Sequence, residues 1–407
     1  MKKSRKKRHN SGLDRKANRL LRKPSFLHKA IQKVGDLGVV GEERNRGIVI
    51  LSGISKALPE PTSVLVKGPT SSGKSNLVKT TLRLFPANCI VDRAGLSPKA
   101  LAHRKASLKH KILFINELRS AKEAQLLLRL LQSEGKIEHE FTTVRGGARG
   151  TTTAKRIGMP VVLSTTTDEE VFADDETRFL SIWVDESSAQ SRAILLARAR
   201  RPLNPDYSDL PVWQRAMSML VYKKGDFEHP PKWIEYVAKK LPRDQVRVRR
   251  DWDRCLKFCS AVALWQSFTK KTPVDISFED YCIAYCMLEP VFASTLQSLR
   301  AQKDVLSGTV AKLYKRFQRA VTVQEITEEL GWKKPVVYKH LRKAIKNHLV
   351  KYEDGTRERN VKRVLPIDHG VGRFLPSPRS VLKHHPELGD KVKYVDPLSG
   401  KWKAVRR

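Results

Sequence analysis

Short apolar runs alternate with longer segments of helical periodicity between residues 63 and 190. The runs have the length and apolar content of buried strands, and they lie at 63–67, 89–91, 112–116, 161–165 and 179–184. Parallel strands need long crossover connections, which are usually helices, so this alternation is typical of a parallel sheet covered by helices. The pattern therefore predicts an α/β fold.

A different pattern fills residues 136–157, between the third and fourth predicted strands. Two strand-like segments flank Arg145-Gly-Gly-Ala-Arg-Gly150, which predicts a β-hairpin with a glycine-rich tip. The hairpin carries four cations that we expect to grip a DNA strand, namely Arg145, Arg149, Lys155 and Arg156. The alternative is a solvated turn.

The region after residue 190 is predicted to be helical until about residue 303 and then changes character. Residues 321–345 read as a helix, a turn at Gly331 and a second helix, and a strand-rich stretch with a turn at Asp354-Gly355 follows. This order predicts a winged helix. Its second helix carries cations suited to a DNA backbone or groove, namely Lys334, Lys339, Arg342 and Lys343. The alternative is a protein-docking domain with a solvated basic face.

The sequence therefore predicts five parts. They are a disordered basic tail (1–25), an α/β core (26–190), a helical lid (191–303), a winged helix-turn-helix (304–366) and a basic irregular tail (367–407).

Charge narrows the choice of partner. The chain has 79 Lys and Arg against 42 Asp and Glu, a formal net charge of +37. Such an excess favours a polyanion, because neutralised phosphates release counterions. A membrane surface is the rival partner, but no basic amphipathic helix or lipidation signal stands out, so nucleic acid is the prediction and no membrane is expected. The basic N-terminus lacks the apolar stretch of a secretion signal, which predicts a cytoplasmic protein.

Four of the five cysteines form two pairs with helical spacing, Cys255/Cys259 and Cys282/Cys286. Zinc sites usually place at least one pair on a tight knuckle, whereas these pairs lie within predicted amphipathic helices. Buried free thiols are therefore favoured over a zinc site.

The first predicted strand runs directly into Gly68-Pro-Thr-Ser-Ser-Gly-Lys-Ser75. This spacing lets backbone N–H groups wrap nucleotide phosphates, with Lys74 on the β and γ phosphates and the Ser75 hydroxyl on Mg²⁺. A serine-rich turn is the alternative, but the preceding strand and following helix favour a P-loop that binds ATP. The predicted binding residues are Gly68, Pro69, Thr70, Ser71, Ser72, Gly73, Lys74, Ser75 and Asn76.

The third predicted strand ends in Asn116-Glu117. A carboxylate delivered by a strand beside the P-loop can activate the attacking water, so Glu117 is the predicted base. Asn116 stands where an aspartate is usual, and its amide oxygen can still accept hydrogen bonds from the waters of Mg²⁺. An ordinary helix-start carboxylate is the alternative role for Glu117.

These motifs together resemble the AAA+ motor of the MCM replicative helicases, and still more the shortened MCM-like ATPases of mobile elements. The similarity covers roughly residues 36–365, from Val-Val-Gly-Glu-Glu-Arg at 39–44 through the P-loop, the hairpin and the winged helix. The resemblance implies that Thr166 or Thr167 senses the γ-phosphate. Thr177-Arg-Phe resembles the segment with the arginine finger, which implies that Arg178 acts on a neighbouring subunit's ATP. Arg250 would be the sensor 2 arginine, with Arg249 as the alternative.

The chain departs from the family in lacking the long N-terminal domain and in having Asn116 in place of an acid. The resemblance nevertheless predicts a DNA-dependent ATPase that forms a hexamer-type ring of identical subunits and drives a helicase in DNA replication. Two alternatives stay open. One is an AAA+ winged-helix initiator or loader, and the other is a DNA-binding regulator whose ATPase is vestigial.

Overall fold

The computed structural model describes residues 2–98, 101, 106–145, 148–168, 176–200, 207–243, 246–268, 274–303, 305–346, 350–353, 362–366 and 374–407. The chain divides into two compact units. The first contains Met1–Lys240, Arg247–Leu288 and Ser377–Arg407, and the second contains Leu241–Val246 and Glu289–Pro376. Among the described residues, no helix is both long and apolar enough to cross a membrane.

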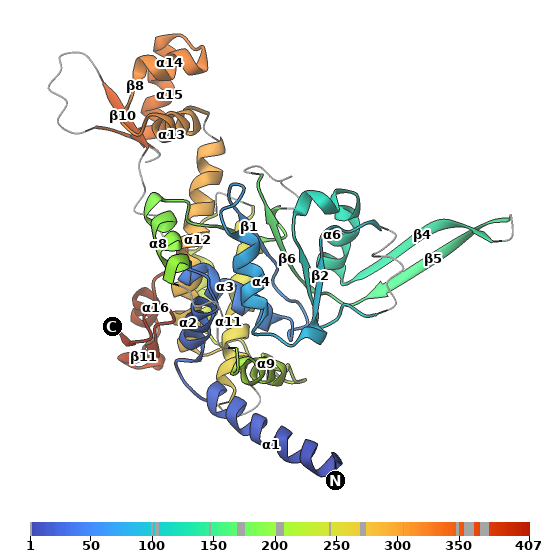
Figure 1. Cartoon of the computed structure of the whole chain (residues 1–407). Helices are drawn as coiled ribbons and strands as arrows, with labels where there is room; N and C mark the ends of the chain where they lie inside the picture. The colour runs from blue at the N-terminus through green and yellow to red at the C-terminus, as the bar shows by residue number, and fades with distance from the viewer. Residues whose placement is uncertain are drawn as a thin grey trace. The chain divides into compact units, whose positions relative to one another are not determined.

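The first unit is built on a five-stranded parallel sheet (Figure 1). Its strands are β1 (Val64–Lys67), β2 (Ile90–Arg93), β3 (Ile112–Ile115), β6 (Val161–Thr166) and β7 (Leu180–Trp183). They lie in the order β2-β3-β6-β1-β7, and every neighbouring pair is parallel. All residues of β1, β3 and β6 are buried, as expected for strands covered on both faces. All five strands predicted from the sequence are confirmed.

Helices and short turns of helix lie before β1 and between the later strands, and they surround the sheet. They are α2 (Phe26–Asp36), α3 (Glu43–Ser55), α4 (Lys74–Leu82), η1 (Ala87–Cys89), η2 (Leu118–Ala124) and α6 (Gln125–Glu134). Leu127, Leu128 and Leu131 of α6 are buried in one apolar cluster with Leu113 and Ile115 of β3. This α/β arrangement confirms the predicted fold class.

The hairpin predicted between the third and fourth core strands is also present. Strands β4 (Lys136–Arg145) and β5 (Ala148–Ile157) pair antiparallel along their whole length, from Lys136 opposite Ile157 to Arg145 opposite Ala148. The four cations predicted to grip DNA lie on this hairpin, but their side chains are outside those described, namely Arg145, Arg149, Lys155 and Arg156.

Helices also fill the region predicted as a lid. They are α8 (Ser188–Arg200), α9 (Leu210–Met219), α10 (Trp233–Lys240), α11 (Val248–Gln266) and α12 (Phe278–Lys303). Cys255, Cys259 and Cys282 are buried free thiols that pack as small apolar groups, and Cys286 is half-buried. In the described part of the chain, no group of three or more His, Cys, Asp or Glu side chains is placed to hold a metal ion.

The N-terminus differs from the prediction of a disordered tail, because Lys2–Leu21 form a helix, α1. Ala17 and Leu21, one helical turn apart, are completely buried. Asp14 forms an ion pair with Arg215 of α9, at 2.5 Å between Oδ1 and Nε, and α1 packs along α9. The basic composition of residues 1–25 predicted disorder, whereas the second half of the helix gains its order from these distant partners.

The prediction of an irregular C-terminal tail is also wrong, since residues 377–407 are folded. It forms α16 (Pro378–His384), a turn of 3-10 helix, η3 (Pro386–Leu388), and an antiparallel hairpin of β11 (Lys391–Val395) and β12 (Trp402–Arg406). Tyr394 is buried, and its hydroxyl lies 3.4 Å from the Cys286 thiol. The His28 ring nitrogen contacts the Pro397 carbonyl at 3.1 Å. These contacts make residues 377–407 part of the first unit.

The second unit contains the predicted winged helix. It comprises α13 (Val305–Phe317), β8 (Val321–Thr322), α14 (Val323–Leu330), α15 (Lys334–Lys346), β9 (Val350–Tyr352) and β10 (Arg363–Pro366), with a sheet of order β8-β10-β9. Thr322 and Glu325 form a capping box at the start of α14, and Gly331 ends it with a φ of 63°. The predicted wing turn at Asp354-Gly355 lies outside the described residues.

Candidate nucleotide-binding site

The P-loop connects the end of β1 to the start of α4. Gly68 has a φ of +153°, and a Cβ atom there would lie 2.5 Å from the Cγ2 atom of Val184, so this position requires glycine. Gly73 has a φ of 91° and forms the N-cap of α4. Pro69, Thr70 and Ser71 are exposed between these glycines. The helix therefore presents its N–H groups and the positive end of its dipole beneath an open loop, which is the geometry of an anion site.

Lys74 is the first residue of α4, and its ammonium lies inside the loop. Its Nζ atom donates hydrogen bonds to the carbonyl oxygens of Gly68, at 2.8 Å, and Pro69, at 2.6 Å. Burial lowers the pKa of Lys74 below its usual value, while the charge of Glu117 raises it in part. The lysine is thus a partly desolvated cation held by neutral carbonyls, which phosphate oxygens can replace.

Three strands deliver polar side chains to the same edge of the sheet as the P-loop. Because parallel strands have their carboxyl ends on one edge, Asn116 and Glu117 after β3 and Thr166 at the end of β6 lie on the side of Lys74. Thr166 is buried, and its hydroxyl accepts a hydrogen bond from the Asp168 N–H at 3.0 Å. The structure therefore brings together the residues predicted for phosphate binding, the catalytic base and sensor 1.

Glu117 is half-buried, and its Oε1 atom is buried without a hydrogen-bond partner among the described residues. An unpartnered carboxylate oxygen costs free energy unless a ligand or water satisfies it. The Ser75 hydroxyl, the Asn116 amide and the Glu117 carboxylate offer hard oxygen donors, which is the ligand chemistry that Mg²⁺ prefers. These residues fit a nucleotide–Mg²⁺ complex, which Ser75 would hold directly and Asn116 would hold through water.

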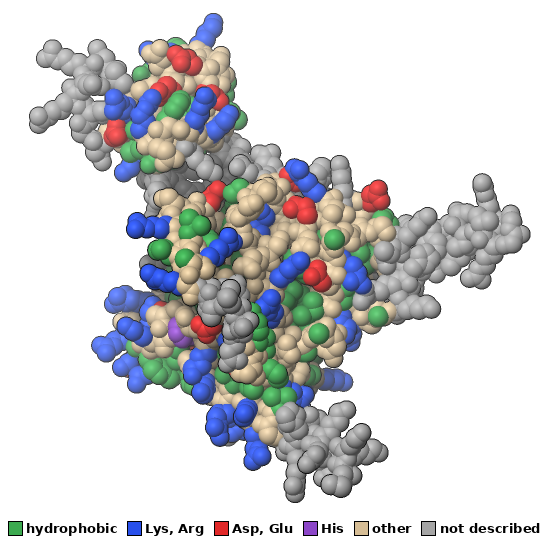
Figure 2. Space-filling view, viewed as in Figure 1, with side chains coloured by type: hydrophobic (Ala, Val, Ile, Leu, Met, Phe, Trp, Pro, Cys, Tyr) green, Lys and Arg blue, Asp and Glu red, His purple; other side chains and the backbone are tan. Residues whose placement is uncertain are grey.

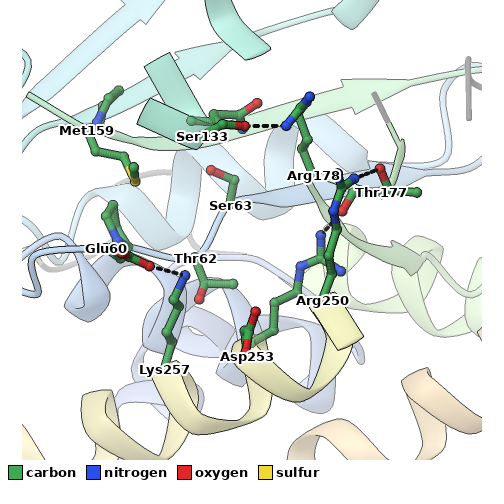
Figure 3. A pocket seen from close by; sticks show the side chains of 14 residues that line it. Glu60, Thr62, Ser63, Ser133, Met159, Thr177, Arg178, Arg250, Asp253 and Lys257 are labelled. Carbon is green, nitrogen blue, oxygen red and sulfur yellow. Dashed lines mark hydrogen bonds and ion pairs between the residues drawn. The ribbon is translucent and has the colours of Figure 1, made fainter. Parts of the chain in front are cut away.

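The predicted arginines lie elsewhere, in a pocket of about 280 Å³ (Figure 3). Arg178 reaches into it and donates to the Ser133 hydroxyl, and Arg250 donates to the Thr177 hydroxyl. Ser63, which directly precedes β1, also lines the pocket. The pocket is therefore at the amino end of β1, whereas the P-loop follows its carboxyl end. Arg178 and Arg250 are together, but they are not beside Lys74.

A buried ion network on α11 holds the segment that carries Arg178. Asp251 accepts from Arg254 at 2.5 Å and from Arg247 at 3.3 Å. Arg254 also donates to the Thr177 carbonyl, and Arg247 donates to the Phe179 carbonyl at 3.5 Å. Burial lowers the pKa of Arg254 to about 10, and the Asp251 carboxylate opposes that effect.

Sequence reasoning missed this network. The spacing of its charges, three and four residues apart on a helix, was visible in the sequence, but the backbone partners, 68 and 77 positions away, were not.

A second buried ion pair was also missed. Lys67, the last residue of β1, is 2% exposed, and its Nζ atom lies 2.8 Å from Oε1 of Glu176. The Ser181 hydroxyl donates to the same oxygen at 3.1 Å. The pair joins the strand before the P-loop to the segment before Arg178. A lysine at the end of an otherwise apolar strand was the available signal, because a buried charge requires a partner.

In the second unit, the cations predicted for DNA are exposed on α15, namely Lys334, Lys339, Arg342 and Lys343. The opposite side of α15 is apolar, with Val337, Leu341 and Ala344 buried in the core of the winged helix. The basic positions therefore form a solvent-facing surface on the second helix of the helix-turn-helix.

Comparison with protein families supports the assignment of the first unit. Residues 13–205 match the model of the MTBMA_p00010 P-loop domain family. A search of curated proteins gives no match. The chain therefore contains a P-loop nucleotide-binding domain, and this agrees with the sheet order and loop geometry described above.

Solved structures show weaker likenesses. A full-length MCM homolog from Methanopyrus kandleri is 15% identical with a TM-score of 0.45, and the match covers 68% of this chain and 60% of that one. An active helicase, SCCmec type IV Cch, is 10% identical with a TM-score of 0.34 over 84% of this chain and 68% of that one. The Aeropyrum pernix ORC1 protein in complex with DNA is 15% identical with a TM-score of 0.26, over 86% and 93%. At these values, any function must be argued from the site itself.

Proposed function

We propose that this protein is a DNA-dependent ATPase whose catalytic sites form between copies of the chain, as a ring-forming motor of the MCM-like type. One observation carries the proposal. Lys74, Glu117 and Thr166 gather at the carboxyl edge of the sheet, whereas Arg178 and Arg250 line a separate pocket at its amino edge. Each copy thus has two incomplete halves of a hydrolytic site, and a head-to-tail contact that closes into a ring would unite them.

In this proposal, the chain's own residues divide the work of hydrolysis. Lys74 exchanges its bonds to the Gly68 and Pro69 carbonyls for phosphate oxygens, and the P-loop N–H groups hold the remaining charge. Glu117 orients the attacking water and takes its proton. When bound, ATP would supply the phosphoryl group, and Mg²⁺ would neutralise charge on its phosphate oxygens. Arg178 of the adjacent copy stabilises the charge that spreads over the transferring group, and Arg250 assists it.

Subunit complementation tests the shared site. Lys74→Ala removes one half and Arg178→Ala removes the other, so each variant alone should lose hydrolysis by about 10³-fold or more. Mixed rings should regain up to about a quarter of the wild-type rate, because random assembly joins two intact halves at one interface in four. Arg192→Ala, at an exposed position of α8, is the matched control and should leave the rate unchanged. If the mixture stays inactive although mixed rings form, Arg178 does not act between copies.

The motor role requires a separate measurement. A helicase-type motor hydrolyses ATP faster with single-stranded DNA and displaces a strand from a forked substrate in an ATP-dependent way. The exposed cations of α15 favour a second candidate, an initiator or loader that protects a duplex site without unwinding it. Protection of a defined duplex, with no strand displacement, would select that candidate.

A further inference from the structure

The C-terminal hairpin of β11 and β12 carries a basic surface that the nucleotide site does not use. Residues 374–407 contain eight Lys and Arg against three Asp and Glu. Figure 2 shows Lys and Arg side chains gathered over the part of the surface where α16 and β11 lie in Figure 1. The surface therefore has the charge that a polyanion requires.

The strand register places the key side chains on one face of the hairpin. Lys391 is opposite Arg406, Lys393 is opposite Ala404, and Val395 is opposite Trp402. Side chains of directly opposed residues, and of every second residue along a strand, share a face. One face therefore presents Lys391, Lys393 and Arg406 beside an aromatic ring.

The ion pairs of the hairpin involve other cations than those of this face. Asp396 pairs with Lys403, at 2.5 Å, and Asp390 pairs with Arg407, at 3.2 Å. Among the residues that the structure describes, no carboxylate forms an ion pair with the three cations of the shared face, Lys391, Lys393 and Arg406. Like charges directly opposite each other destabilise a hairpin, so the opposed cations are best explained by an anionic ligand.

Trp402 is 64% exposed, which is unusual for the largest apolar side chain. It lines a pocket of about 220 Å³ together with Lys393 and Val395 of the same face. The pocket also includes Lys23, and it has Gln266 and Glu279 in its wall. An amide and a carboxylate can bond the edge of a nucleobase, and an indole can stack on its face.

We propose that this hairpin face and its pocket bind single-stranded DNA, with Trp402 stacking on an unpaired base while Lys391, Lys393 and Arg406 contact the adjoining phosphates. A single strand is required because bases in a duplex are not free to stack on a side chain. The choice of DNA over RNA rests on the proposed function, whereas the choice of a single strand rests on the hairpin itself. This site is distinct from the hairpin β4–β5 and from the winged helix.

Binding of a labelled oligothymidylate of about 12 nucleotides, measured by fluorescence anisotropy without ATP, tests the site. Trp402→Ala should weaken binding by about 5- to 150-fold, the loss of one stacked base, and Trp402→Phe should retain most of the affinity. Leu195→Ala, which removes another exposed apolar side chain, is the control and should change nothing. Lys391→Ala combined with Lys393→Ala should reduce the slope of log affinity against log salt by about 1.4.

Crosslinking gives a local readout that other DNA-binding surfaces cannot mimic. An oligonucleotide with 5-iodouracil should crosslink to Trp402 in the wild-type protein. Wild-type affinity in Trp402→Ala, or an absence of crosslinks to the hairpin, would overturn the proposal. Equal affinity for a duplex would overturn the assignment to a single strand, and tighter binding of an oligouridylate would overturn the assignment to DNA.

The Lys74→Ala variant separates this inference from the proposed function. It should bind the oligonucleotide as the wild type does when ATP is absent. A wild-type protein that hydrolyses no ATP but depends on Trp402 for binding would refute the proposed function alone. An active ATPase whose oligonucleotide binding does not depend on Trp402 would refute this inference alone.

Discussion

Replacement of Asp251 by asparagine should be strongly destabilising, although the change keeps the shape of the side chain. The carboxylate is 4% exposed and is shared by Arg247 and Arg254, which are both buried. Asparagine leaves these two cations without a compensating charge. Removal of one partner from a buried ion pair typically costs about 3–5 kcal/mol, because the remaining charge stays desolvated.

That loss corresponds to a fall of about 5–8 °C in the melting temperature of the first unit, measured by calorimetry. Hydrolysis should also fall, because Arg247 and Arg254 hold the carbonyl groups on either side of Arg178. Asp253→Asn is the matched control on the same helix. Its side chain is exposed, so its effect should stay within about 0.5 kcal/mol.

A second substitution distinguishes lost charge balance from general damage. Arg254→Met in the Asp251→Asn background removes the buried cation that has lost its partner, so it should recover part of the stability. A melting temperature unchanged by Asp251→Asn would refute the reasoning. A double variant that is less stable than Asp251→Asn would refute it as well, since the two losses would then be independent.

Two further predictions concern the loop and the winged helix. Gly68→Ala should abolish nucleotide binding measured by calorimetry, because a Cβ atom there would lie 2.5 Å from Val184. The free energy of unfolding should also fall by about 1 kcal/mol or more. Normal binding would show that the loop does not need its positive φ. Hydrogen bonding from Arg319 lowers the pKa of Glu325 to about 2, below its usual 4.5, so its stabilising effect is present above pH 4.5 and is lost as the pH falls toward 2. In Glu325→Gln, the free energy of unfolding, measured by circular dichroism, should therefore fall less between pH 4.5 and pH 2 than in the wild type. The difference should be less than about 1 kcal/mol, because the ion pair is partly exposed. Equal profiles would contradict this.

The local patterns of the sequence were enough for the framework of the fold. Three of the core strands, β1, β3 and β6, contain apolar runs whose buried character is visible from their own residues, and the hairpin and the helix-turn-helix have their own turn residues. The P-loop could be predicted because the positive φ angles that it needs belong to two glycines, Gly68 and Gly73, which lie within one stretch of nine positions. Such features depend on neighbours in the sequence, so sequence reasoning recovers them.

The ends of the chain could not be predicted in this way. Ala17 and Leu21 order α1 only because α9 and Trp265 lie against them, and Trp265 donates to the Leu21 carbonyl at 3.2 Å. Likewise, Tyr394 is buried against Cys286, more than a hundred positions away. The composition of these segments indicates their charge, but it does not indicate the distant apolar surfaces against which they pack.

The two halves of the candidate site also differ in what the sequence indicates and what only the tertiary structure decides. The sequence indicated Lys74, Glu117 and Arg178 as the residues proposed to carry ATP hydrolysis, since each belongs to a recognisable motif. Only the tertiary structure decided that Arg178 and Arg250 share a pocket at the amino edge of the sheet, away from Lys74 at the carboxyl edge. The direction of parallel strands fixes which edge a residue occupies, and that direction is a property of the assembled sheet rather than of any segment within it.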